Sequence, residues 1–143
     1  MREILFRGKR ADTGEWIYGD LRQDADLESA YIGGWDYFTA DYALQREPFE
    51  YPVSPETVGQ FTGLTDKNGN RIFEGDIIEA HFDELFPDLA TTLIVVWSDY
   101  GWFGRDMEGN VDSLECKWVS DFFEIIGNIH DNPELLEVSG NNG

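Results

Sequence analysis

Few residues in this sequence have the types and the spacing that catalysis or metal binding requires. The only histidines are His81 and His130, and they stand far apart in the chain. A zinc or non-haem iron site needs three or four ligands at controlled distances, so two such histidines would serve only beside carboxylates that the fold brings close. Cys116 is the only cysteine, which excludes an intrachain disulfide and a cluster of thiolate ligands. We expect no metal ion and no other cofactor.

Asp66, Asn68 and Asn70 repeat the spacing that opens the calcium loop of an EF-hand. The sixth position of that loop requires glycine and is Arg71 here, and the twelfth requires glutamate and is Ile77. The pair Asn68-Gly69 is instead a strong short-range signal for a β-hairpin turn. We therefore predict a tight turn with a positive φ at Gly69 and no calcium site.

Signatures of the common enzyme classes are missing from the sequence. The patterns GxSxG, GxxxxGKS/T, GxGxxG and HExxH do not occur. The chain has 29 carboxylate side chains, too many to single out a general acid and a general base. We predict a protein that is not an enzyme and nominate no catalytic residue.

The charge of the chain is strongly negative and unevenly distributed. Residues 1–22 carry five basic and four acidic side chains, and the remaining residues carry five basic and 25 acidic ones. Affinity for phosphate groups comes mainly from lysine and arginine, so we expect no direct binding of nucleic acid or of an anionic membrane. The N-terminus lacks the apolar run of a signal peptide, and no stretch approaches the roughly 20 apolar residues of a transmembrane helix. These features favour a cytoplasmic location.

The first third of the chain is predicted to form short strands around turns. An apolar segment at residues 4–7 and an aromatic one at 15–18 flank turn residues, which predicts a β-hairpin. The glycine pair at 33–34 interrupts an aromatic segment, so we expect two strands with a turn between them. Three prolines between residues 48 and 55 should stop any regular element, and this segment is the expected linker or the edge of the main domain.

The rest of the chain is predicted to form a small β-domain with turns at Asn68-Gly69 and near Gly109. The run at 91–97 is the most strongly β-biased, which predicts a central strand with Val95 buried, and we expect Ile126 to be buried in the last strand. The predicted fold class is α+β, mostly β: a small, strongly bent SH3-like barrel with an N-terminal hairpin layer and a short C-terminal helix. The predicted segments are residues 1–52 for the hairpin and aromatic β part, 53–137 for the barrel and its helix, and 138–143 for a loose tail.

Aromatic side chains make up 15% of the residues and are the most suggestive feature of the sequence. Packing in the core is their default role. One small core cannot hold all of them, so we expect a few to form an exposed interaction surface, above all those close to glycines. The candidate residues are Trp35, Tyr37, Tyr100, Trp102 and Phe103.

Several segments resemble one known family. The opening MREILFRGKR with GEWIYGDL, the blocks PETVGQFTGLTDKNGNRIFEGDII and LIVVWSDYGWFG, and the ending FEIIGNIHDNPELL follow the order typical of YopX-like proteins. The resemblance implies a phage or prophage origin, a location in the host cytoplasm, an α+β fold dominated by a barrel-like sheet, and self-association. It implies no activity and no catalytic residues.

Three functions remain open from the sequence. The first is a non-enzymatic phage accessory protein that works as a protein-interaction module and as a homo-oligomer. In such an oligomer the basic N-terminal hairpin would lie on the acidic domain of a neighbouring copy, or else its arginines would pair with carboxylates of their own chain. The second is an acidic decoy that occupies the basic, nucleic-acid-binding surface of a host protein. The third is an enzyme that uses carboxylates without a recognisable motif.

Overall fold

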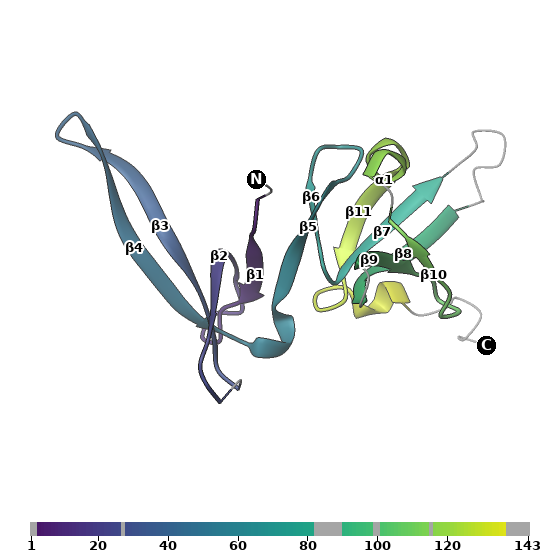
Figure 1. The fold of residues 1–143 in the computed structure, drawn as a ribbon, viewed down its shortest axis with the longest axis horizontal. Coiled ribbons are helices and arrows are strands. Elements are labelled where there is room, and N and C mark those ends of the chain that lie inside the picture. The colour runs from purple at the N-terminus through teal and green to yellow at the C-terminus, as the bar shows by residue number, and fades with distance from the viewer. Residues whose placement is uncertain (1–2, 27, 82–89, 99–100, 115, 137–143) are drawn as a thin grey trace. The chain divides into compact units, whose positions relative to one another are not determined.

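The computed structural model describes residues 3–26, 28–81, 90–98, 101–114 and 116–136. The chain divides into two compact units, unit 1 (Met1–Gln60) and unit 2 (Phe61–Gly143). Figure 1 shows that the described residues form mainly antiparallel strands, with one short α-helix among them. The prediction of a mostly β chain is confirmed.

Unit 1 is built from antiparallel strands joined by short turns. Its elements are β1 (Phe6–Lys9), β2 (Trp16–Gln23), β3 (Ala30–Ala40), β4 (Ala43–Val53), the 3₁₀ turn η1 (Pro55–Thr57) and the start of β5 (Gly59–Thr65). The strands lie in the order β4-β3-β2-β1-β5. The first half of β2 pairs with β1 and its second half pairs with β3, so β2 joins the N-terminal hairpin to the β3–β4 hairpin.

β3 runs without interruption through the glycine pair at which the sequence predicted a turn. Gly33 pairs with Glu50, and Gly34 pairs with Phe49, within an unbroken ladder. Because glycine has no side chain, these positions allow the backbones of adjacent strands to approach closely, and no turn forms. A Cβ atom on Gly33 would lie 2.5 Å from the carbonyl oxygen of Phe49, and one on Gly19 would overlap the carbonyl oxygen of Gly33. The predicted break was wrong because these glycines serve the packing of adjacent strands.

β4 contains two of the three prolines that were expected to stop a regular element. Pro48 pairs with Trp35, and Pro52 pairs with Tyr31. The carbonyl oxygen of Pro52 accepts a hydrogen bond from the amide of Ala11, on the side of β4 opposite β3. Residues two apart in a strand direct their backbone groups to the same side, so Pro48 also faces away from β3. The expectation was wrong because a proline on the outer side of an edge strand removes no hydrogen bond from the ladder.

The core of unit 1 is small and lies at the foot of the β3–β4 hairpin. Its buried side chains and those packed against them are Ala30, Ile32 and Val53, with Phe6, Ile17, Leu21 and Val58. The core therefore ends close to the point where β2 stops pairing with β3, and the outer parts of β3 and β4 contribute no side chain to it.

Unit 2 contains a five-stranded antiparallel sheet. Its elements after β5 are β6 (Arg71–Phe73), β7 (Asp76–His81), β8 (Ala90–Ser98), β9 (Gly101–Arg105), β10 (Val111–Ser113), α1 (Cys116–Phe122), β11 (Phe123–Asn128) and the 3₁₀ turn η2 (Pro133–Leu136). The described strands lie in the order β10-β9-β8-β7-β11, so β8 is central, as predicted for residues 91–97. β10 and β11 remain as the two edges, so the described sheet is not a closed barrel, and the SH3-like form of the prediction is not confirmed. The chain after the short β10 forms α1 instead of a further strand that could join these edges.

The core of unit 2 is larger than that of unit 1. Its buried residues are Ile72, Ile78, Ala80, Leu93, Val95, Val119 and Phe123. Val95 is fully buried, as predicted. Ile126 is only partly buried, contrary to expectation, because the register between β11 and β7 shifts between Ile125 and Gly127. Such a bulge takes a residue out of the regular alternation of side chains.

Two turns of unit 2 share the same hydrogen bonds. One spans residues 66–70 between β5 and β6, and the other spans residues 106–110 between β9 and β10. In each turn a carboxylate oxygen of the leading aspartate accepts hydrogen bonds from the amides two and four residues later, at 2.9 to 3.0 Å. Gly69 has a φ of 82° and Gly109 a φ of 92°, which confirms the predicted positive φ at Gly69. The Asp66 carboxylate, which the calcium pattern singled out, thus binds the backbone of its own turn.

Candidate interaction surface on the β3–β4 hairpin

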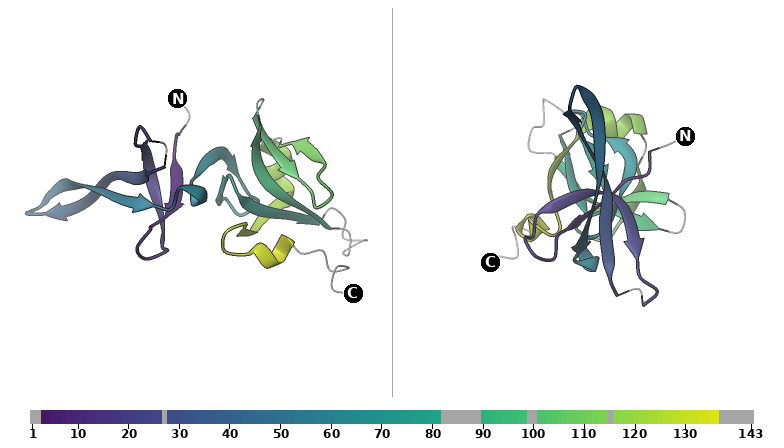
Figure 2. Two further views of the ribbon diagram at one scale, coloured as in Figure 1. Left: turned by 90° about the horizontal axis from the view of Figure 1, so that it is seen from below. Right: turned by 90° about the vertical axis from the view of Figure 1, so that its left-hand side faces the viewer.

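The outer part of the β3–β4 hairpin extends beyond the rest of the strands of unit 1. β2 pairs with β3 only as far as Gly33, whereas β3 and β4 pair with each other up to the turn at Asp41-Tyr42. We call residues 34–49 the arm, and Figures 1 and 2 show it projecting away from β1 and β2. Among the described strands, the two sides of the arm pair only with each other. A two-stranded ribbon of this kind is marginally stable in water by itself.

The arm has two faces of different composition. Side chains alternate along a strand, and residues opposite each other in an antiparallel pair project to the same face. The face that we call the Trp35 face carries Trp35, Tyr37 and Thr39 of β3 with Leu44, Arg46 and Pro48 of β4. The Phe38 face carries Asp36 and Phe38 of β3 with Gln45, Glu47 and Phe49 of β4. Trp35 is 47% exposed, Tyr37 62% and Leu44 73%, so the Trp35 face presents a row of large apolar side chains to solvent.

Arg46 lies against the aromatic side chains of the Trp35 face. Its guanidinium carbon is 4.1 Å from the centroid of the Trp35 ring, within the range of a cation–π contact. Tyr37 stands directly opposite Arg46 in the ladder, and both line a shallow hollow with Leu44. Tryptophan, tyrosine and arginine are the residues that most often dominate the binding energy of protein interfaces, and this face gathers all three.

The tip of the arm is a two-residue turn in the left-handed region, with φ values of 52° at Asp41 and 63° at Tyr42. Such a turn matches the twist of the two strands, but its second position usually holds glycine. A side chain in this conformation costs about 1–2 kcal/mol per residue. Tyr42 is nonetheless fully exposed. A bulky aromatic residue kept in a costly conformation and directed into solvent marks the tip as part of the candidate surface.

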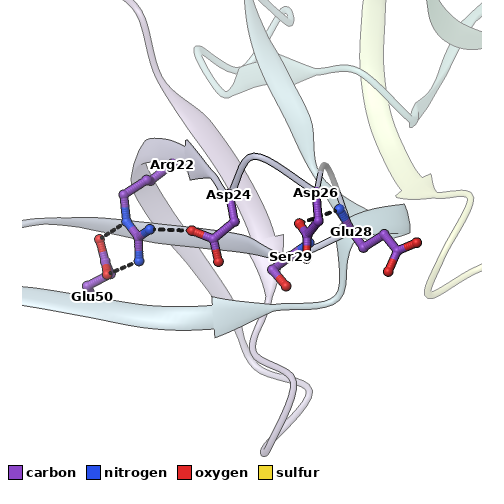
Figure 3. Close-up of polar contacts among 6 residues, drawn as sticks. All are labelled: Arg22, Asp24, Asp26, Glu28, Ser29 and Glu50. Carbon is purple, nitrogen blue, oxygen red and sulfur yellow. Dashed lines mark hydrogen bonds and ion pairs between the residues drawn. The ribbon is translucent and has the colours of Figure 1, made fainter.

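A hollow of about 540 Å³ lies at the base of the arm and is lined by Arg22 and Glu50 beside Gly33. Arg22 donates two hydrogen bonds to Glu50, at 2.9 and 3.2 Å, and one to Asp24, at 2.7 Å (Figure 3). The hydrogen bonds from Arg22 hold the pKa of Glu50 below its ordinary value. Glu50 therefore stays ionised at neutral pH and is unsuited to donate a proton. The ion pair connects β2 to β4 and braces the base of the arm.

Comparison with known proteins assigns the chain to a family. The family described as YopX protein matches residues 5–137, which is most of the chain. The chain belongs to the YopX family. The crystal structure of protein EF1440 from Enterococcus faecalis is similar, with a TM-score of 0.67 and 24% sequence identity over 96% of this chain and 100% of that chain. At this identity the similarity shows a shared fold alone. No curated protein matches the sequence.

The candidate aromatic residues of unit 2 have a different setting in this YopX-family chain. Trp102 is partly buried against the core of unit 2, and its ring lies edge-on to that of Trp97, with centroids 4.8 Å apart. Phe103 follows Trp102 on β9, so the two project to opposite faces of the strand. Tyr100 lies outside the described residues. Of the five predicted residues, the structure brings only Trp35 and Tyr37 together on one exposed face.

Several exposed residues of the arm were not predicted from the sequence as part of an interaction surface, namely Phe38, Tyr42, Leu44 and Arg46. The available signal was an alternation of large side chains at 35 and 37 and again at 44 and 46. The glycines and prolines on either side of these positions predict a turn and a linker, and this prediction obscured the alternation of a single long hairpin.

The basic residues of β1 contact their own unit. Arg7 is buried, with its guanidinium carbon 4.7 Å from the centroid of the Trp16 ring, and the Lys9 amine lies 5.4 Å from the same ring. Arg10 forms an ion pair with Asp12 at 2.8 Å. These contacts support the alternative in which the N-terminal cations serve their own chain.

Other parts of the described chain offer weaker candidates. Among the described residues, no group of three or more His, Cys, Asp or Glu side chains is placed to hold a metal ion. No described helix is long and apolar enough to cross a membrane. A hollow in unit 2 is lined by Asp106, but hydrogen bonds from the turn, above all from Asn110, hold the pKa of Asp106 below its ordinary value. That carboxylate is therefore engaged in the turn.

Proposed function

We propose that this YopX-family chain is a non-enzymatic accessory protein of a phage or prophage that works as a protein-interaction module through the Trp35 face of its arm. The observation that carries the proposal is the exposure of Trp35, Tyr37 and Leu44 on a ribbon that no other described strand covers. Soluble proteins rarely leave contiguous apolar surface in solvent unless that surface binds something.

The charge of the arm supports a protein partner over a nucleic acid. The arm carries Arg46 against Asp36, Asp41 and Glu47, so it is acidic overall. A phosphate backbone would be repelled by this balance, because neutralising phosphates requires lysine and arginine. Tryptophan and tyrosine around a single arginine suit a protein surface instead.

Capture of partners from a host lysate tests the proposal with matched tryptophans. The full chain, a Trp35→Ser variant and a Trp97→Ser variant serve as baits, because Trp97 is 57% exposed in unit 2 and provides a control of the same chemistry. We expect the retained protein to be lost or reduced at least tenfold with Trp35→Ser and retained with Trp97→Ser. Equal retention by all three baits would contradict binding through the arm.

The acidity of unit 2 supports the acidic decoy as a second candidate. Residues 61–143 carry 17 acidic and four basic side chains, a balance that attracts basic protein surfaces and repels nucleic acid. A partner held in this way should be released as salt rises, since screening shortens to about 3 Å at 1 M. It should also be retained by the Trp35→Ser bait, which separates this function from binding through the arm.

A further inference from the structure

The turn of the arm determines which residues direct their backbone N–H and C=O groups toward its two outer edges. Ala40 and Ala43 close the two-residue turn as the last pair of the ladder, and in such a hairpin this pair exchanges both backbone hydrogen bonds. Every second residue back from Ala40 therefore directs its N–H and C=O toward β4, and the residues between them direct theirs away from β4. The outward carbonyl of Pro52, which Ala11 binds, fits the same alternation.

The outer edge of β4 is poorly suited to receive another strand. Its outward residues along the arm are Leu44, Arg46 and Pro48, and Pro48 has no N–H to donate. The foot of the same edge is already occupied by the contacts of Arg10 and Ala11. Proline on an edge strand is a common device against unwanted pairing.

The outer edge of β3 is open along the arm. Its outward residues are Trp35, Tyr37 and Thr39, and each has both an N–H and a C=O. β2 covers this edge only up to Gly33, so residues 34–40 are free of a second strand among the described strands. The stretch contains no proline, and its pairing with β4 shows no register shift. A regular open edge of this kind is a template for strand addition.

We propose that a second copy of the chain occupies this edge, with the two β3 strands antiparallel and the two-fold axis at Tyr37. The inference rests on the proposed function and names the partner of the arm. In this register Tyr37 stands opposite Tyr37 of the second copy, Trp35 opposite Thr39, and Gly34 opposite Ala40. The open stretch 34–40 is then covered from end to end, with about six new backbone hydrogen bonds from three pairs that each exchange two.

Neighbouring registers fit less well. An axis at Asp36 would place two carboxylates opposite each other and would place Thr39 of the second copy opposite Gly33, where β2 already pairs. An axis at Phe38 would place Trp35 opposite the turn of the second copy, outside the paired stretch. With the axis at Tyr37, the two Trp35 faces join side by side in a four-stranded ribbon, and sheets of three or more strands are stable where an isolated hairpin is not. The contact is also self-complementary, as a two-fold dimer requires.

A matched pair of proline variants tests the edge. Thr39 and Leu44 stand directly opposite each other in the arm, and both direct their N–H outward, Thr39 to the β3 edge and Leu44 to the β4 edge. Thr39→Pro therefore blocks the proposed contact, whereas Leu44→Pro makes the same chemical change on the other edge. In sedimentation velocity of the full chain, we expect the wild type and Leu44→Pro to be dimers of twice 16.4 kDa, and Thr39→Pro to have half that mass. A monomeric wild type, a dimeric Thr39→Pro variant, or equal loss in both variants would overturn the proposal.

Cross-linking tests the register. In a background in which Cys116, the only cysteine, is replaced by serine, Tyr37→Cys brings two identical positions to about 5.5 Å between Cα atoms, within reach of a disulfide. Arg46→Cys, on the opposite strand, is the control. We expect mild oxidation to convert most of the Tyr37→Cys chain to a covalent dimer and little of the Arg46→Cys chain. Equal cross-linking of the two variants would contradict an axis at Tyr37.

The two proposals fail in different ways. If the chain is a monomer and a lysate protein is retained through Trp35, the arm binds a different protein, and the second copy is excluded while the proposed function stands. If the chain is a monomer and Trp35→Ser changes no capture, both proposals fall.

Discussion

Unit 1 and unit 2 are both antiparallel β structures, yet they cover their strands in different ways. In unit 2 a five-stranded sheet and α1 surround a core of buried aliphatic and aromatic residues. In unit 1 three small or branched residues form the buried centre, and more than half of the longest hairpin lies outside it. Every described lysine or arginine of unit 1 lies over an aromatic ring of the same unit. Unit 2 thus buries its strands against its own core, whereas the strands of the arm lie outside the core of unit 1.

The largest effect on folding is expected in the core of unit 2. Phe123 is fully buried, and its ring and that of Trp118 meet edge to face, while the preceding residue, Phe122, is 43% exposed. Phe123→Ala should lower the free energy of unfolding of unit 2 by about 3–5 kcal/mol through a lost contact surface and a cavity. Phe122→Ala should lower it by less than about 1 kcal/mol. Urea denaturation followed by tryptophan fluorescence measures the free energy of unfolding of both variants. Comparable decreases would contradict the expectation that burial determines the cost of each substitution.

A smaller effect separates the two similar turns. Asp66 is buried, and its second carboxylate oxygen accepts a hydrogen bond from the amide of Ile125 on β11, at 3.0 Å. Asp106 uses its second oxygen for the side chain of Asn110 in the same turn. Asp66→Ala should therefore lower the free energy of unfolding by about 2–3 kcal/mol, because it leaves amides in a partly buried region without an acceptor. Asp106→Ala should cost clearly less. Thermal unfolding of the two variants measures the difference, and equal midpoints would contradict the role of the contact to β11.

A stabilising change is expected at the tip of the arm. Tyr42→Gly removes a side chain from a left-handed position and should stabilise the hairpin by about 1 kcal/mol. Amides of Phe38 and Gln45, which pair across the arm, should then exchange with solvent about fivefold more slowly. Tyr42→Ala keeps the strained backbone position and serves as the control. Unchanged amide exchange in Tyr42→Gly would show that strain in the turn does not affect opening of the hairpin. Weaker partner capture by this more stable arm would place Tyr42 in the interface.

The smallest effect concerns the exposed ion pair at the base of the arm. The pKa of Glu50 is lowered in the folded chain by hydrogen bonds from Arg22. The stabilisation is therefore fully present above the ordinary pKa of a glutamate and is lost as pH falls through the lower folded value. The wild type should exceed Glu50→Gln slightly in melting temperature at pH 7, and the gap should close in acid. A gap that widens toward low pH would contradict this assignment.

Features set by neighbouring residues could be predicted from the sequence. The turn at Gly69 follows from the conformational freedom of glycine beside asparagine, and the central strand at residues 91–97 follows from its β-branched run. Features that depend on which strand lies alongside could not be predicted. Pro48 is harmless only because its nitrogen faces an open edge, and Gly33 is a strand residue because two neighbouring backbones approach it closely. The closed barrel failed for the same reason, since closure depends on whether distant edges meet.

The candidate surface was predictable in part. Trp35 and Tyr37 could be selected because aromatic residues next to glycines exceed what a small core can hold. Leu44 and Arg46 could not, because their position opposite Thr39 and Tyr37 depends on the register of a hairpin that the prolines concealed. The strained Tyr42 carries no sequence signal of its own, since tyrosine is not a typical residue of such turns.

The contact between Asp66 and Ile125 also bears on how the chain folds as it leaves the ribosome. Its two residues are 59 positions apart, and β11 is the last strand of unit 2. Unit 1 has all of its pairing partners once Gln60 has been synthesised. Domains of this size generally fold in order of synthesis, so the strands of unit 1 pair with each other while unit 2 still lacks an edge strand and the last donor to Asp66. The exposed arm is therefore available for pairing during translation, and neighbouring ribosomes on one messenger would present newly made arms to each other before either chain is finished.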